Sequence, residues 1–295
     1  MRPADLLRML SLAAIWGSSY ALMRIITPVY GGAGTMWLRI GIAGLALLLY
    51  AKATSTDLGF RQHWRAYLFI GLMSSALPFW LIGFAMQTLP ASYGARLNAA
   101  SPLFGAVFAT LMLGERLGAS RVVGLVVGFA GVGMIVNLGP LQVTPQVLLA
   151  ATACVAATVS YGFISVWIKK YLKGAPNMGL AACTLMLATV VTTPLALPLT
   201  PWVIPSLSVG MAVLTLALMC SAIAYLLYYR LIADIGPTKA ISVTFLIPVF
   251  GVMWGVVFLD ERLTLGALLG GVVVCVGMSL VLGLWKRSDG VLQTR

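Results

Sequence analysis

The chain has 295 residues, of which 61% are hydrophobic and only 9% are charged, and its mean hydropathy is +1.01. A soluble domain carries roughly 25% charged residues because its surface must contact water, so the composition excludes a soluble globular protein. The net charge of +12 does not indicate nucleic-acid binding, because the Lys and Arg residues stand one to three at a time between apolar segments.

Apolar segments of about 20 residues, long enough to cross a bilayer core of roughly 30 Å, recur along the chain. In lipid each such segment must satisfy its own backbone groups, so we predict an all-α integral membrane protein with ten transmembrane helices. The helices are expected at 7–27, 33–51, 65–87, 91–113, 119–138, 146–168, 178–198, 207–230, 237–259 and 264–285. The first is predicted to be an uncleaved helix, because Trp16, Tyr20 and Arg24 interrupt the small-residue pattern of a signal-peptide cleavage site.

The Lys and Arg residues of alternate connections predict the orientation of the chain. Fifteen of them fall on one side, against Arg262 alone on the other: Arg2, Arg8, Lys52, Arg61, Arg65, Arg116, Arg121, Lys169, Lys170, Lys173, Arg230, Lys239, Lys286, Arg287 and Arg295. Basic connections stay in the cytoplasm, so both termini are expected there, in a multi-pass protein of the cell inner membrane.

An internal repeat relates the two halves of the sequence. At an offset of 146 residues, Pro102, Phe104 and Gly105 align with Pro248, Phe250 and Gly251, Glu115-Arg116-Leu117 aligns with Glu261-Arg262-Leu263, and Ser75 aligns with Ser221. At an offset of 145, Trp16-Gly17 aligns with Tyr161-Gly162. Five helices are an odd number, so the repeats 1–140 and 141–295 are predicted to lie in the membrane with opposite orientations, as in alternating-access transporters. A duplicated membrane scaffold with no transport role is the other interpretation.

The paired signatures Gly114–Leu117 and Asp260–Leu263, each following a Pro–Phe–Gly segment, resemble those of the EamA family in the drug/metabolite transporter superfamily. The opening Ile15-Trp16-Gly17-Ser18-Ser19 is similar to the first helix of that family. Within the family the chain most resembles the bacterial YddG-type exporters of aromatic amino acids. The resemblance implies a ten-helix basket around a central cavity, lined mainly by helices 1, 3, 4, 6, 8 and 9. It also implies that helices 5 and 10 pack together at the rim.

Acidic residues are missing from the middle of every predicted helix, and Glu115, Asp234, Asp260 and Glu261 stand at helix ends. A proton-coupled antiporter of cationic drugs normally needs a buried carboxylate. We therefore expect facilitated or otherwise non-carboxylate-coupled movement of a neutral, zwitterionic or anionic solute.

Three arginines lie within predicted helices. Arg24 and Arg39 are expected to extend towards the periplasmic interface, although a role in substrate binding is open for each. Arg96, with Asn98 and Ser101 on the same helix, is a candidate for binding a substrate carboxylate, and a packing or gating contact is the alternative.

Aromatic residues lie well inside the predicted helices, where they need a polar partner or a cavity. The candidate substrate-binding residues are Trp16, Tyr20, Phe79, Arg96, Asn98, Ser101, Tyr161, Phe163, Tyr225 and Phe245. The pairs Trp16/Tyr161 and Phe79/Tyr225 are favoured because the repeat relates them. Ordinary helix packing is the alternative for each aromatic residue.

Prolines and glycines predict the moving parts and the close helix contacts. Pro78, and the segments Pro102–Gly105 and Pro248–Gly251, are expected to act as hinges or gates, because proline removes a backbone donor and bends a helix. Two GxxxG pairs, Gly124–Gly128 and Gly266–Gly270, permit close contact of helices 5 and 10, within one chain or between two.

No enzymatic activity, cofactor or metal is expected. The four cysteines lie in apolar segments and are expected to be buried free thiols, and the single histidine, His63, lies in a connection.

We expect an exporter of amino acids, aromatic or neutral, or of related metabolites. A multidrug or nucleobase exporter of the same superfamily is the alternative, and an integral membrane enzyme acting on lipid is a further one. The expected partners are a small solute and the lipid bilayer, and the sequence does not distinguish a monomer from a homodimer.

Overall fold

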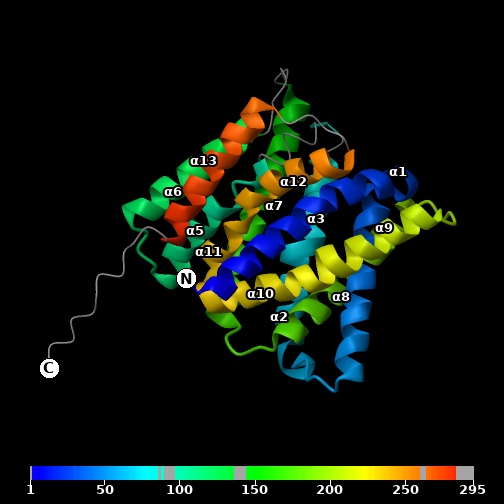
Figure 1. The fold of residues 1–295 in the computed structure, drawn as a ribbon. Coiled ribbons are helices and arrows are strands. Elements are labelled where there is room, and N and C mark those ends of the chain that lie inside the picture. The colour runs from blue at the N-terminus through cyan, green and yellow to red at the C-terminus, as the bar shows by residue number, and fades with distance from the viewer. Residues whose placement is uncertain (1, 86–87, 90–96, 136–143, 260–263, 284–295) are drawn as a thin grey trace.

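The computed structural model describes residues 2–85, 88–89, 97–135, 144–259 and 264–283, which form helices joined by short turns, with no strand among them (Figure 1). The helices are α1 (Pro3–Ala53), α2 (Phe60–Gly71), α3 (Leu77–Ala85), α5 (Ser101–Leu113), α6 (Ala119–Ile135), α7 (Pro145–Tyr171), α8 (Asn177–Ala196), α9 (Leu207–Ala217), α10 (Ala224–Ile235), α11 (Pro237–Ile241), α12 (Val243–Leu259) and α13 (Leu265–Leu282). A short 3₁₀ turn, Leu197–Leu199, extends α8.

Seven helical segments in the described part of the chain are long and apolar enough to cross a membrane. They are Pro3–Ala53, Phe60–Ile82, Pro145–Tyr171, Asn177–Leu199, Leu207–Ile235, Pro237–Val257 and Leu265–Leu282, and α5 and α6 are shorter apolar helices. The predicted all-helical membrane fold class is therefore confirmed.

Helix α1 contains the first two predicted helices, 7–27 and 33–51, and is interrupted at Gly31. The backbone of Gly31 has φ 68° and ψ 172°, a conformation that a residue with a Cβ rarely adopts. In Figure 1 the darker first half of α1 and the lighter second half run in different directions. The connection predicted between these two helices therefore takes the form of a sharp break at one glycine.

Two π-helical turns interrupt long helical segments. The first π turn, Leu72–Ala76, joins α2 to α3, and the second π turn, Leu218–Ile223, joins α9 to α10. Their first residues lie 146 positions apart, the offset of the sequence repeat. A π turn disturbs the regular backbone ladder and offers carbonyls to other donors. The Ser160 hydroxyl of α7 donates to the Met73 carbonyl at 2.7 Å, and Trp16 Nε1 of α1 donates to the Cys220 carbonyl at 3.2 Å.

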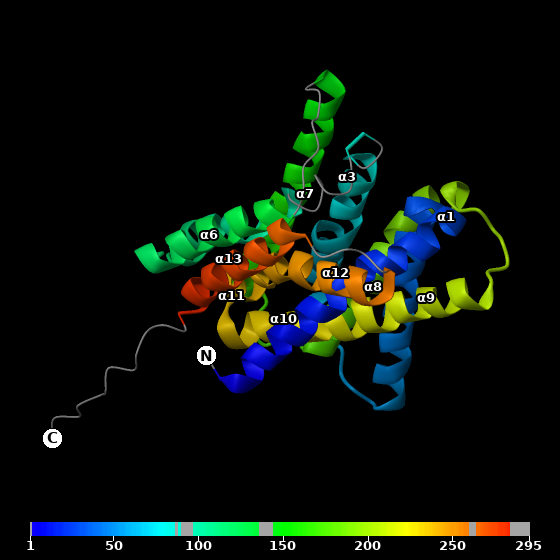
Figure 2. The same ribbon diagram turned by 45° about the horizontal axis from the view of Figure 1, so that its top comes forward.

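Helices α6 and α13 lie side by side at one edge of the molecule in both views (Figures 1 and 2). A Cβ added to Gly124 would lie 2.7 Å from the Gly277 carbonyl oxygen, and one added to Gly131 would lie 2.7 Å from the Val274 nitrogen. The two backbones are therefore in direct contact, as glycines in membrane helices permit. The glycine-rich faces of helices 5 and 10 meet within one chain.

Gly277→Val is expected to lower the melting temperature in detergent by roughly 5 °C or more, because overpacking costs about 1–3 kcal/mol. A Cβ at this position would overlap the backbone of Gly128, which no side-chain movement can relieve. The matched control is Gly210→Val in α9, where an added Cβ meets nothing within 4 Å. Equal melting temperatures for the two variants would show that the α6–α13 contact does not support the fold.

Two further glycine contacts bring the repeats together. A Cβ on Gly17 of α1 would lie 2.7 Å from the Phe250 Cβ and 3.0 Å from the Gly251 nitrogen of α12. A Cβ on Gly162 of α7 would lie 2.7 Å from the Gly105 nitrogen of α5. The sequence repeat aligns Gly17 with Gly162 and Gly105 with Gly251, so repeat-related glycines make both contacts.

An ion-pair network joins the start of α1 to the end of α10. Asp234 accepts hydrogen bonds from Arg8 at 3.0 Å and from Arg230 at 2.9 Å, and it lies 3.2 Å from Arg2. The Asp5 carboxylate, whose side chain is only 3% exposed, accepts from Arg2 at 2.9 Å and from Arg8 at 3.0 Å. We call these five side chains the α1–α10 ion network. In Figure 1 the N-terminus lies beside α10 and α11.

Candidate functional site

An aromatic cluster lies between α1 and α10. The ring centroid of Trp16 is 6.4 Å from that of Tyr225, in an edge-to-face arrangement, and 5.4 Å from that of Tyr228. Tyr229 extends the cluster, with its centroid 5.7 Å from that of Tyr225. Edge-to-face ring pairs at these distances are favourable. The structure thus brings together Trp16 and Tyr225, two of the predicted binding residues, and adds Tyr228 and Tyr229, which sequence reasoning missed.

Polar groups accompany this cluster. The Tyr225 hydroxyl lies 3.2 Å from the Ser75 hydroxyl of the first π turn. The Cys220 carbonyl of the second π turn accepts two hydrogen bonds, one from Trp16 Nε1 at 3.2 Å and one from Arg39 Nη2 at 2.9 Å. Both π turns therefore contribute polar atoms beside the aromatic rings.

Arg39 is buried, with only 8% of its surface exposed. Its Nε donates to the Ser221 hydroxyl at 2.7 Å, and Nη2 donates to the Cys220 carbonyl. Both acceptors lie near the middle of the helical segment Leu207–Ile235. The expectation that Arg39 extends to the membrane interface is therefore wrong. Hydropathy places an arginine along a helix but does not show which way its side chain turns, and the carbonyl offered by the π turn draws it inward.

Four further predicted aromatic residues lie on α3, α7 and α12. Phe79 is half-buried against the main core on α3, and Tyr161 is half-buried on α7. Phe163 belongs to a second ring cluster, 5.3 Å from Phe108 and 6.3 Å from Phe69 between centroids. Phe245 is fully buried, and its ring lies against Gly128 of α6. Phe163 therefore makes ring contacts of its own, and Phe245 packs between α12 and α6.

Asn98 and Ser101 precede and begin α5. The Ser101 hydroxyl donates to the Asn98 backbone carbonyl at 2.6 Å. The side-chain oxygen of Asn98 is buried and has no hydrogen-bond partner in the described part of the chain. Arg96 and the side chain of Tyr20 lie outside the described residues, so their predicted roles remain predictions.

The proposed hinge residues occupy different local positions. Pro102 lies in the first turn of α5, where a missing backbone N–H leaves no bond unmade, so this proline begins a helix. Residues 97–98 are helical and residues 99–100 form a turn before α5, so the hinge at Pro102–Gly105 stays a prediction. Pro248 does lie inside α12, and Pro78 is the second residue of α3, after the first π turn.

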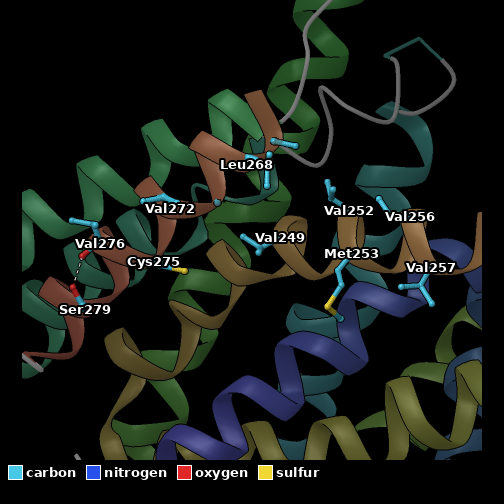
Figure 3. Close-up of a pocket in the computed structure, with 12 residues that line it drawn as sticks. Val249, Val252, Met253, Val256, Val257, Leu268, Val272, Cys275, Val276 and Ser279 are labelled. Atoms are coloured by element: carbon cyan, nitrogen blue, oxygen red, sulfur yellow. Dashed lines mark hydrogen bonds between the residues drawn. The ribbon is translucent and has the colours of Figure 1, made fainter. Parts of the chain in front are cut away.

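A groove of about 690 Å³ runs between α12 and α13 (Figure 3). Its lining is apolar, with Val249, Val252, Met253 and Val272 among its residues. The Ser279 hydroxyl donates to a carbonyl of its own helix at 2.7 Å, so it offers little to orient a polar solute. Cys275 lines the groove and is exposed, which corrects the expectation that all four cysteines are buried.

A second, smaller cavity of about 290 Å³ lies near the end of α10. It is lined by Glu115, Arg116, Arg121, Ile235, Gly236, Thr238 and Lys239. Arg121 and Glu115 are 3.8 Å apart and partly exposed, so their pairing contributes little to stability. Neither this cavity nor the groove is lined by a predicted substrate-binding residue.

Known proteins resemble the chain along nearly its whole length. A protein of Escherichia coli named as the uncharacterized inner membrane transporter YedA is 32% identical, over 83% of this chain and 79% of its own. A protein of Streptantibioticus cattleyicolor named as a probable terminal-alkyne amino-acid exporter is 23% identical, over 90% of this chain and 89% of its own. One solved structure covers 98% of this chain and 100% of its own with a TM-score of 0.84, at 18% identity, and so shares the fold.

The EamA-like transporter family matches the chain twice, at residues 5–137 and at residues 148–283. The two matches cover nearly all the helices described above, and such a family implies a small-molecule solute and a membrane. The chain belongs to the EamA-like transporter family and is a multi-pass membrane transporter.

Proposed function

We propose that the chain crosses the cell inner membrane ten times, as two inverted five-helix repeats, 1–140 and 141–295, with both termini in the cytoplasm. The break at Gly31 supports two crossings within α1, and the shorter apolar helices α5 and α6 supply the crossings beyond the seven long segments. The repeat-related π turns and glycine contacts support the internal symmetry. The distribution of Lys and Arg supports the orientation.

We propose further that the protein exports aromatic or neutral amino acids, or related metabolites, by alternating access. The observation that carries this is the aromatic cluster of Trp16, Tyr225 and Tyr228, with hydroxyl and guanidinium groups at its edge. Rings bind planar apolar groups, and the few polar atoms orient the solute. The relative named as a probable amino-acid exporter supports the solute class.

The test is counter-flow in proteoliposomes that contain the purified full-length protein. Liposomes preloaded with each of the twenty amino acids are expected to accumulate labelled phenylalanine when the internal amino acid is aromatic or neutral. Competition by nucleobases or cationic drugs, with none by amino acids, would support the multidrug or nucleobase alternative. Transport of no amino acid would contradict the proposed solute class.

Transport at a fixed solute gradient is expected to continue when a protonophore collapses the pH gradient. Of the described acidic residues, Asp5 and Asp234 lie in the α1–α10 ion network, Glu115 pairs with Arg121, and Asp57 accepts from the Gly59 backbone in a turn. None lies within the middle of a helix, where a proton-carrying carboxylate belongs. A loss of more than about half the initial rate, with vesicle integrity verified, would contradict facilitated transport.

A further inference from the structure

Arg39 presents a buried positive charge with only neutral acceptors. Within the described part of the chain its hydrogen bonds go to a serine hydroxyl and a backbone carbonyl, and no carboxylate pairs with it. An uncompensated charge buried away from water is costly, and in a membrane protein such a residue marks a functional position. The site therefore has an unfilled requirement for negative charge.

The π turn alone does not require this arginine. In the described part of the chain the first π turn is contacted by the neutral hydroxyls of Ser160 and Tyr225, and no guanidinium or ammonium group bonds to it. The repeat offsets of 145 and 146 align Arg39 with Thr184 and Leu185 of α8, both fully buried and uncharged. The guanidinium is thus specific to one half of the molecule, which favours a role beyond holding a π turn in place.

The surroundings of Arg39 suit an aryl carboxylate. Arg39 Nη2 and Trp16 Nε1 donate to the same carbonyl oxygen, so the guanidinium lies directly beside the aromatic cluster. Nε and Nη2 make the two hydrogen bonds given above, while Nη1 makes none within the described part of the chain. A guanidinium binds carboxylates through parallel N–H donors, and the neighbouring Tyr225 hydroxyl can orient a second polar group.

We propose that Arg39 binds the carboxylate of the transported solute, while Trp16 and Tyr225 contact its apolar part. The solutes are then carboxylates, either zwitterionic amino acids or simple organic anions. Amides and amines that lack a carboxylate are excluded as solutes. This proposal rests on the proposed function, because it assigns the solute-binding group of the same aromatic cluster.

The experiment measures equilibrium binding and transport by the full-length protein with three probes. L-phenylalanine carries both carboxylate and amine, 3-phenylpropanoate carries only the carboxylate, and L-phenylalaninamide carries only the amine. Wild-type protein is expected to bind the first two and to bind the amide at least about tenfold more weakly, since the amide lacks the charged acceptor that a guanidinium binds.

Arg39→Met is expected to lose at least about tenfold in affinity for both carboxylates, and Arg39→Lys is expected to retain part of it, because lysine keeps the charge but not the paired donors. The matched control is Arg65→Met, which removes one exposed charge elsewhere, and is expected to bind as wild type. Ser221→Ala removes the acceptor of Arg39 Nε but keeps the charge, and is expected to retain carboxylate selectivity.

If Arg39→Met does not fold, the selectivity of Arg39→Lys and Ser221→Ala for phenylpropanoate over the amide decides the question. If wild-type protein binds phenylpropanoate and the amide with equal affinity, the assignment of Arg39 is overturned. The same holds if wild-type protein and Arg39→Lys bind phenylpropanoate with equal affinity. Neither result would contradict transport itself. Carboxylate binding that depends on Arg39 without any transport would refute the proposed function and leave the assignment standing. Absence of carboxylate binding by wild-type protein would overturn the assignment of Arg39.

Discussion

Replacing Gly17 or Gly162 with leucine is expected to reduce transport at least about tenfold, because overpacking costs about 1–3 kcal/mol at contacts that cannot relax. An added Cβ at Gly17 would overlap the Phe250 Cβ and press on the backbone of α12, and one at Gly162 would overlap the backbone of α5. Each glycine lies where a helix of one repeat crosses a helix of the other. Rates in proteoliposomes, normalised to the amount of folded protein, measure the effect.

The controls use the other side of each contact. A Cβ on Gly251 would lie 4.0 Å from the Gly17 carbonyl oxygen, so Gly251→Ala is expected to melt near the wild-type temperature, whereas Gly17→Ala is expected to melt lower. On Gly105 an added Cβ would meet the Ile241 side chain at 3.0 Å, which can move, so Gly105→Ala should be milder than Gly162→Ala. Identical melting temperatures within each pair would contradict the crossing geometry.

The sequence predicted the fold class well because lipid imposes a simple physical requirement. Long apolar segments without charge must be helical, so hydropathy located the helices, and the break at Gly31 lies between the predicted helices 7–27 and 33–51. Glycine spacing correctly indicated that α6 and α13 approach closely, because only residues without a Cβ permit backbone contact. The π turns were not predicted, since their sequences, Leu72–Ala76 and Leu218–Ile223, are ordinary apolar helix.

The candidate site was harder to predict, because a membrane helix that is apolar all round gives no signal of which face turns inward. Trp16 and Tyr225 were paired with other residues by the repeat, yet they contact each other across α1 and α10. Phe245 lies in an apolar segment like Trp16 and Tyr225, but its ring packs against Gly128 of α6. The inward direction of Arg39 depends on a carbonyl in the second π turn, which no local pattern reveals.

Asp234→Arg is expected to reduce transport several-fold, because it replaces the attraction between Asp234 and three arginines with repulsion between like charges. The Asp234 side chain is 14% exposed, and its carboxylate forms ion pairs with Arg2, Arg8 and Arg230. A fourth guanidinium there would repel the other three and separate the start of α1 from the end of α10. Since Trp16 and Tyr225 stand on these same two helices, the aromatic cluster would lose its alignment. Initial rates of counter-flow measure the loss.

Asp57→Arg provides the matched control, because it changes the net charge of the protein equally. Asp57 lies in an exposed turn and accepts a hydrogen bond only from the nearby Gly59 backbone at 2.9 Å, so near wild-type transport is expected. Asp234→Asn removes the charge without adding repulsion and should fall between the two. A graded loss in the order Asp57→Arg, Asp234→Asn, Asp234→Arg would tie transport to the contact between α1 and α10, whereas equal rates in all three would separate the ion network from the transport cycle.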